Sequence, residues 1–168
     1  IELSTRDGTR SYSLFAPPGT EPVPLVVFLH GAGGSAEWAD EETGWSRLAS
    51  AERFALALPE GLPPDASRPA KFLTNPLRWN DGSVGPTGTS STADDVAFLT
   101  EVIDDASRRV AIDPARIYVT GFSNGAGMTF RLGTALAPRL AAIAPVAGYC
   151  WWRELKPSRP CLLYTSDA

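Results

Sequence analysis

Histidine and cysteine are both scarce in this sequence of 168 residues. There is one histidine, His30, and there are two cysteines, Cys150 and Cys161. Any mechanism that requires a histidine at another position therefore cannot be completed within these residues. Two cysteines at this spacing support neither a disulfide framework nor a zinc site, and we expect no metal centre.

The chain also lacks long apolar runs and an excess of positive charge. Uninterrupted apolar runs are short, such as residues 25–29, so we expect no transmembrane helix and no membrane partner. The net charge of −4 argues against a nucleic-acid partner. The length fits one domain with a substantial core, and 15 glycines with 15 prolines predict long loops on a folded scaffold.

The two ends of the chain carry little functional information. The sequence begins at Ile1 without a signal-peptide pattern. Residues 161–168 (CLLYTSDA) resemble the translation of a transposon adapter used in DNA sequencing libraries, so we expect a non-native tail. The alternative is a natural strand, because its leucines and tyrosine suit one. We expect residues 1–160 to form a single domain.

Apolar, β-branched runs alternate with segments of helical periodicity. The run Leu25–His30 is typical of a strand buried on both faces of a parallel sheet, and Thr92 with Asp95 matches a capping box. This alternation predicts an α/β fold whose ligand site lies beyond the carboxyl ends of the strands. The expected strands are 11–16, 25–30, 54–58, 117–120 and 141–147, the expected helices are 45–53, 92–110 and 126–137, and the long loop 61–91 is expected to be functional.

The segment Gly121–Gly125 reads G-F-S-N-G between an expected strand and an expected helix. In that context a G-x-S-x-G pattern presents the serine hydroxyl as a nucleophile, because glycines on either side let neighbouring backbone pass without Cβ clashes. The helix that follows directs its N-terminal N–H groups at developing negative charge. The pattern predicts Ser123 as the catalytic nucleophile; the alternative is an ordinary helix cap.

A second glycine-rich loop, HGAGG, follows the strand at 25–30. Such a loop supplies one backbone N–H to an oxyanion hole, and the residue after the nucleophile supplies the other. We therefore expect Ala32 and Asn124 to be the two donors. We expect His30 to hold the loop in place rather than act as a base. The residues expected to shape the site without reacting are His30, Gly31, Gly121 and Gly125.

The same loop also satisfies the dinucleotide fingerprint G-x-G-x-x-A over residues 31–36. That interpretation needs a helix to start directly on the loop, and we expect residues 40–44 (DEETG) to interrupt one. It also needs an acidic residue about 20 positions later, where Glu60 lies beyond a proline. Dinucleotide binding is therefore the less favoured alternative.

Five segments, taken in order, resemble esterases of the polyhydroxybutyrate (PHB) depolymerase type, a branch of the α/β-hydrolases that includes feruloyl and acetyl xylan esterases. The resemblance implies an α/β-hydrolase fold that is incomplete at the C-terminus, with a mostly parallel sheet and helices on both faces. It implies a secreted, extracellular serine esterase that needs no cofactor and acts on polyesters or plant-wall polysaccharide esters. The segments are 24–31 (PLVVFLHG), 78–80 (RWN), 93–99 (ADDVAFL), 113–125 (DPARIYVTGFSNG) and 141–148 (AAIAPVAG).

The resemblance also implies roles for particular residues. Trp79 and Asn80 would bind substrate, the alternative being that Trp79 only packs the long loop. Asp94 and Asp95 are interpreted as helix N-terminal charges and loop anchors. The triad of this fold runs Ser, Asp or Glu, then His along the chain, yet no histidine follows Ser123. We expect the catalytic Asp and His to be missing and the chain alone to be nearly inactive; the alternative is a non-catalytic binding protein.

Overall fold

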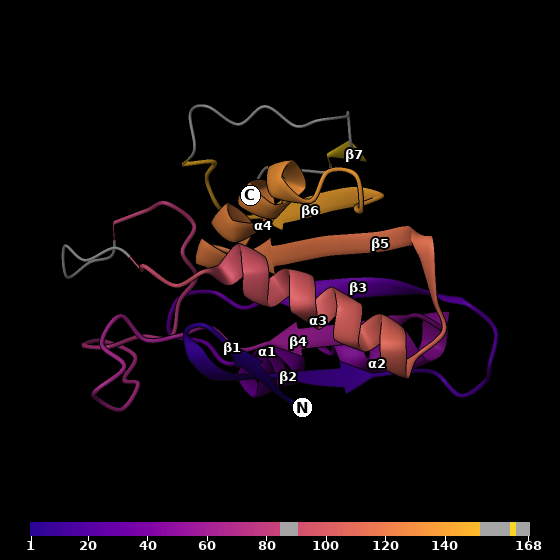
Figure 1. The fold of residues 1–168 in the computed structure, drawn as a ribbon, viewed down its shortest axis with the longest axis horizontal. Helices are drawn as coiled ribbons and strands as arrows, with labels where there is room; N and C mark the ends of the chain where they lie inside the picture. The colour runs from indigo at the N-terminus through magenta and orange to yellow at the C-terminus, as the bar shows by residue number, and fades with distance from the viewer. Residues whose placement is uncertain (85–90, 152–161, 164–168) are drawn as a thin grey trace.

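The computed structural model describes residues 1–84, 91–151 and 162–163, which form a seven-stranded sheet in the order β1-β2-β4-β3-β5-β6-β7 (Figure 1). The pairs β1–β2 and β2–β4 are antiparallel, and all the other neighbours are parallel. The mostly parallel sheet confirms the predicted fold class. The strands are β1 (Glu2–Thr5), β2 (Gly8–Phe15), β3 (Val23–Leu29), β4 (Ala55–Pro59), β5 (Ile112–Phe122), β6 (Ala142–Val146) and β7 (Leu162–Leu163).

Helices cover both faces of this sheet, as predicted. The short helices α1 (Ala36–Thr43) and α2 (Trp45–Glu52) enclose a small apolar cluster on one face. The longer helices α3 (Asp95–Arg109) and α4 (Asn124–Ala135) enclose the main core on the other face. In the part of the chain that the structure describes, no helix is long and apolar enough to cross a membrane.

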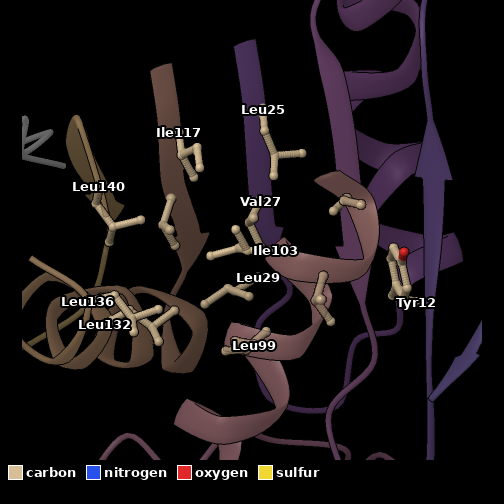
Figure 2. Packing of buried hydrophobic residues seen from close by; sticks show 14 of the residues in the cluster. Tyr12, Leu25, Val27, Leu29, Leu99, Ile103, Ile117, Leu132, Leu136 and Leu140 are labelled. Carbon is tan, nitrogen blue, oxygen red and sulfur yellow. The ribbon is translucent and has the colours of Figure 1, made fainter. Parts of the chain in front are cut away.

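The main core fixes β3 and β5 beside each other. Figure 2 shows Val27 and Leu29 of β3 near Ile103 of α3, and Leu25 of β3 and Leu132 of α4 belong to the same cluster. Each of these five side chains is completely buried, which contributes about 1.5–3 kcal/mol apiece. The end of β3 is paired in register with the end of β5, Leu29 opposite Gly121. The two glycine-rich loops therefore leave the sheet side by side.

The helix α1 is the main difference from the sequence-based expectation, since residues 40–44 do not interrupt it. Ser35 caps its start by accepting a hydrogen bond from the Trp38 N–H at 3.1 Å. Gly44 ends it in a left-handed conformation, at φ 67°. The DEET run is therefore the last part of a helix, with its glycine acting as the C-cap.

The strand β1 was not predicted, and several element boundaries also differ from the prediction, among them the starts of α3 and β5. The cap of α3 is Asp94, whose carboxylate accepts from the Ala97 N–H at 3.2 Å, and not Thr92. The strand β5 begins at Ile112 and runs through Pro114, which was expected to lie between elements. The register between β3 and β5 shifts over this stretch, and such an irregularity tolerates a proline in a strand.

Parts of two predicted segments lie outside the described residues. They are 85–90 of the long loop, and Cys161 with 164–168 of the expected tail. Within that tail, Leu162 and Leu163 pair in parallel with Ala142 and Ile143 of β6. These two residues adopt the strand of the alternative interpretation, while the non-native origin of the tail stays a prediction.

Candidate active site

Ser123 sits on the sharp turn between β5 and α4. Its backbone adopts φ 54° and ψ −113°, a conformation that costs a non-glycine residue on the order of 1–3 kcal/mol. Its N–H donates to the Val146 carbonyl at the end of β6, at 3.0 Å. The side chain is exposed and makes no capping hydrogen bond to α4. Ser123 is thus the N-cap residue of α4 by position, but its hydroxyl does not cap the helix and is exposed on a strained turn.

Three glycines allow this turn to touch the loop after β3. A Cβ on Gly121 would lie 2.6 Å from the Gly125 carbonyl oxygen. A Cβ on Gly125 would collide with the carbonyl oxygens at the end of β3. A Cβ on Gly31 would lie 3.1 Å from the ring of Phe122, which is closer than an ordinary contact. Backbone therefore packs directly on backbone around the serine, in the arrangement that the glycine spacing predicts.

The two expected oxyanion donors line the same cavity as Ser123, which has a volume of about 490 Å³. The N–H groups of Gly33 and Gly34 bond to protein carbonyls at 2.7 and 3.0 Å. Among the described residues, the N–H of Ala32 makes no such bond. The N–H of Asn124 is the first of α4, so no helical carbonyl precedes it. Both residues line the cavity, and their role as oxyanion donors stays a prediction.

His30 is buried behind the loop, with 1% of its surface exposed. Its Nδ1 lies 2.8 Å from the Gly31 carbonyl oxygen, and its Nε2 lies 2.9 Å from the Gly61 nitrogen. Only the neutral ring with its hydrogen on Nδ1 satisfies both contacts. Burial lowers the pKa of His30 to about 4. Both ring nitrogens are bonded to backbone, which leaves neither of them to take a proton from Ser123.

Trp79 and Asn80 do not line the cavity, so the expectation that they bind substrate is not met. Trp79 is fully buried, and its ring lies 5.1 Å from that of His30 between centroids. The side-chain amide of Asn80 donates to the Ala93 carbonyl at 2.9 Å. The alternative, in which Trp79 packs the long loop, matches the structure. Sequence alone could not decide this, because an aromatic among polar residues suits either role.

Asp95 anchors the long loop from the start of α3, as expected. One carboxylate oxygen accepts from Arg10 of β2 at 2.6 Å, and the other accepts from the Asn80 N–H at 2.6 Å. Both side chains of this ion pair are fully buried. Arg10 also lies over the Phe98 ring, 3.8 Å from its centroid. Sequence reasoning missed Arg10, because a single arginine in a strand carries no signal of burial.

The cavity walls come mainly from the long loop and from the turn after β6. Near the mouth, Phe72, Leu73 and Tyr149 are each more than 70% exposed. Deeper in the wall, Arg78 donates to the Ser83 hydroxyl at 2.8 Å, and that hydroxyl donates to Asp81 at 2.6 Å. The long loop was predicted to be functional, but apart from Arg78, in the segment 78–80, no motif singled these residues out. The remaining lining residues are Pro76, Val84, Ala147, Gly148 and Trp151.

A second cavity of about 360 Å³ is lined by residues 31–34 of the glycine-rich loop after β3. It shares Ala32, Phe72 and Ser123 with the first cavity. Trp38 of α1 and Phe122 of β5 complete its apolar wall. Ser123 therefore lines both cavities, and two cavities at one serine can hold the two groups attached to a reacting carbonyl.

The loop does not present an open site for a dinucleotide. The Glu60 carboxylate accepts a hydrogen bond from the Ala36 N–H at 3.0 Å, so the protein's own acid occupies the N-terminus of α1. A pyrophosphate would need those N–H groups. Within residues 1–84, 91–151 and 162–163, no three His, Cys, Asp or Glu side chains are grouped to hold a metal ion.

Comparison with known proteins identifies the family. The family model described as "Esterase PHB depolymerase" matches residues 10–153. The chain belongs to this family. It is 35% identical to an esterase of Nocardia uniformis subsp. tsuyamanensis over 88% of this chain and 40% of that protein. It is 32% identical to feruloyl esterase B of Piromyces equi over 84% of this chain and 25% of the relative.

A solved structure supports the fold of this PHB depolymerase family member. The S-formylglutathione hydrolase of Agrobacterium tumefaciens superposes with a TM-score of 0.67 at 16% identity, over 88% of this chain and 56% of that one. An identity this low speaks for the fold alone, which is that of the α/β-hydrolases. The chain spans less than half the length of the two curated relatives described above.

Proposed function

We propose that this protein is a serine carboxylic-ester hydrolase that works through an acyl-enzyme on Ser123. One observation carries the proposal: an exposed serine hydroxyl on a strained strand-to-helix turn shares a cavity with two backbone N–H groups. A turn of this kind is built to hold a nucleophile. Ser123 adopts a φ of 54°, and backbone strain of this kind concentrates at functional sites.

The proposed reaction has two steps. The Ser123 oxygen attacks the ester carbonyl carbon, and the N–H groups of Ala32 and Asn124 stabilise the negative oxygen of the tetrahedral intermediate. Collapse of that intermediate releases the alcohol and leaves the acyl group on Ser123. Water then attacks the acyl-enzyme through a second tetrahedral intermediate and releases the acid. In characterised enzymes the loss of one such donor raises the barrier by about 3–4 kcal/mol.

The base and acid of the triad are proposed to lie outside these 168 residues. His30 is the single histidine of the chain, and both of its ring nitrogens are bonded to backbone. Ser123 without a base is a weak nucleophile, so the chain alone is expected to retain only the residual catalysis of binding and the oxyanion hole. Asp81 and Arg78 lie in the cavity wall and are not assigned to the triad.

The proposed substrates are polyesters or esters of plant-wall polysaccharides. The family description names PHB depolymerases, and relatives include feruloyl esterase B and poly(3-hydroxyalkanoate) depolymerase C of Paucimonas lemoignei. The exposed apolar side chains at the cavity mouth suit an apolar acyl group or polymer surface. Plant-wall polysaccharides lie outside the cell, so secretion is part of the same proposal.

Hydrolysis of p-nitrophenyl esters and labelling by a fluorophosphonate test this function. The 168-residue chain and the longest natural protein that contains it should be compared, each with Ser123→Ala. The matched control is Ser50→Ala, a substitution of an exposed serine on α2. We expect the natural protein to hydrolyse the ester and take up one label, both abolished by Ser123→Ala alone. A folded natural protein that does neither would support the non-catalytic binding alternative.

A further inference from the structure

Two hydrogen bonds join Asn124 and Trp79 beside the proposed oxyanion hole, and we call this pair of bonds the clasp. The Trp79 N–H donates to the Asn124 side-chain oxygen at 2.7 Å. The Asn124 side-chain nitrogen donates in return to the Trp79 carbonyl at 3.2 Å. Both residues are buried. The amide therefore ties the first residue of α4 to a loop residue 45 positions away in the sequence.

Trp79 extends this connection to the loop that carries the other donor. Its indole N–H donates to the His30 carbonyl at 2.9 Å. The His30 ring donates in turn to the Gly31 carbonyl at 2.8 Å. A continuous series of buried hydrogen bonds thus runs from the side chain of Asn124, through Trp79 and His30, to the residue before Ala32.

Asn80, the residue after Trp79, holds this clasp in place. The Asn80 N–H donates to Asp95, which is paired with Arg10 inside the core. The Asn80 carbonyl accepts from Arg131 of α4. The position of Trp79 is therefore fixed from β2, α3 and α4, independently of the cavity that substrate would occupy.

We infer that Trp79 is a positioning residue that sets the separation of the two oxyanion donors, an inference that rests on the proposed esterase function. The donors lie on different segments, Ala32 after β3 and Asn124 at the start of α4. Stabilisation of the intermediate requires both to be preorganised within about 0.5 Å, and a misplacement of about 1 Å costs roughly 100-fold in rate. Trp79 is the residue bonded to both segments.

The test is Trp79→Phe in the natural protein that shows esterase activity. This substitution removes the indole donor and keeps a large aromatic ring. We expect kcat per titrated active site to fall about 10- to 100-fold while KM changes less than about two-fold. Affinity for a trifluoromethyl ketone, which forms a tetrahedral adduct with the serine, should fall by the same factor as kcat. The matched control Trp45→Phe, in the apolar cluster under α2, should leave kcat unchanged.

A second variant keeps the inference testable if Trp79→Phe does not fold. Asn124→Ala retains the backbone N–H but removes the other half of the clasp, so it should lower kcat in the same way. The double variant should lose little more than the more affected single variant, because both act on one unit. Folded variants that lose thermal stability but keep kcat and ketone affinity would overturn the inference. An inactive wild type, or an active Ser123→Ala, would instead refute the proposed function.

Discussion

Acidification should destabilise this fold through its one histidine. Burial lowers the pKa of His30 to about 4 in the folded protein, against 6.5 for an ordinary histidine. Between these values the unfolded chain binds the proton and the folded chain does not, so the free energy of unfolding falls as the pH falls. Each pKa unit corresponds to about 1.4 kcal/mol. Lowering the pH from 7 to 5 should therefore cost about 2 kcal/mol at this residue.

Two charged groups near His30 affect how much stability is lost on acidification. Arg10 contributes to lowering its pKa by charge repulsion, although burial is the larger cause. Glu60 lies 3.7 Å from Nε2, and burial raises the pKa of that carboxyl above 4.5. A raised carboxyl pKa affects stability in the opposite direction to the lowered pKa of His30. The folded state binds the carboxyl proton more tightly than the unfolded chain does, so protonation of Glu60 on acidification stabilises the fold. Glu60→Gln removes this opposing contribution, so the free energy of unfolding of the variant should fall more steeply on acidification.

Urea unfolding monitored by tryptophan fluorescence at pH 7, 6 and 5 measures the effect. The comparison is between the wild type and His30→Asn, which does not titrate in this range. The variant is expected to be less stable at pH 7 but to lose about 2 kcal/mol less than the wild type on going to pH 5. Since His30 is the single histidine, its ring C–H resonances report the folded pKa directly. Parallel stability curves, or a ring that titrates near pH 6.5, would refute this account of His30.

Three further perturbations test the packing around the site. Gly125→Ala would drive a Cβ into the carbonyl oxygens at the end of β3 and should lower the stability measured by thermal melting by several kcal/mol. The control Gly8→Ala, at φ 99° with open space around it, should cost only about 1–3 kcal/mol. Equal losses would contradict the close contact between Gly125 and the end of β3. Arg10→Met should lower stability by about 3–5 kcal/mol, because it leaves the buried Asp95 charge unpaired. The double variant Arg10→Met with Asp95→Asn should regain part of that stability. A double variant as unstable as the sum of the two single variants would argue against a buried Arg10–Asp95 ion pair. Leu132→Ala, in the centre of the main core, should cost about 2–5 kcal/mol in urea unfolding, and a smaller loss would indicate a looser core than the structure shows.

Local sequence patterns predicted the fold class and the types of the main elements of this protein well. The apolar run at β3 and the helical periodicity of α3 specify elements whose burial is nearly independent of their partners, so their types and the α/β class were correct. The helix α1 was missed because the run of four polar residues at its end, DEET, suits a loop as well as a solvent-exposed helix end. Its cap at Ser35 and its termination at Gly44 depend on how the chain enters and leaves the turn.

The sequence by itself determined the candidate nucleophile, because a glycine spacing of this kind has a steric reason that acts over five residues. It also determined that His30 was the one histidine available. Only the tertiary structure decided what surrounds them. Trp79 is fully buried and does not line the cavity, and Arg10 pairs with Asp95 across 85 residues of sequence. Such contacts depend on how strands and helices pack in space, since burial and hydrogen-bond partners are set by residues that are distant in the chain.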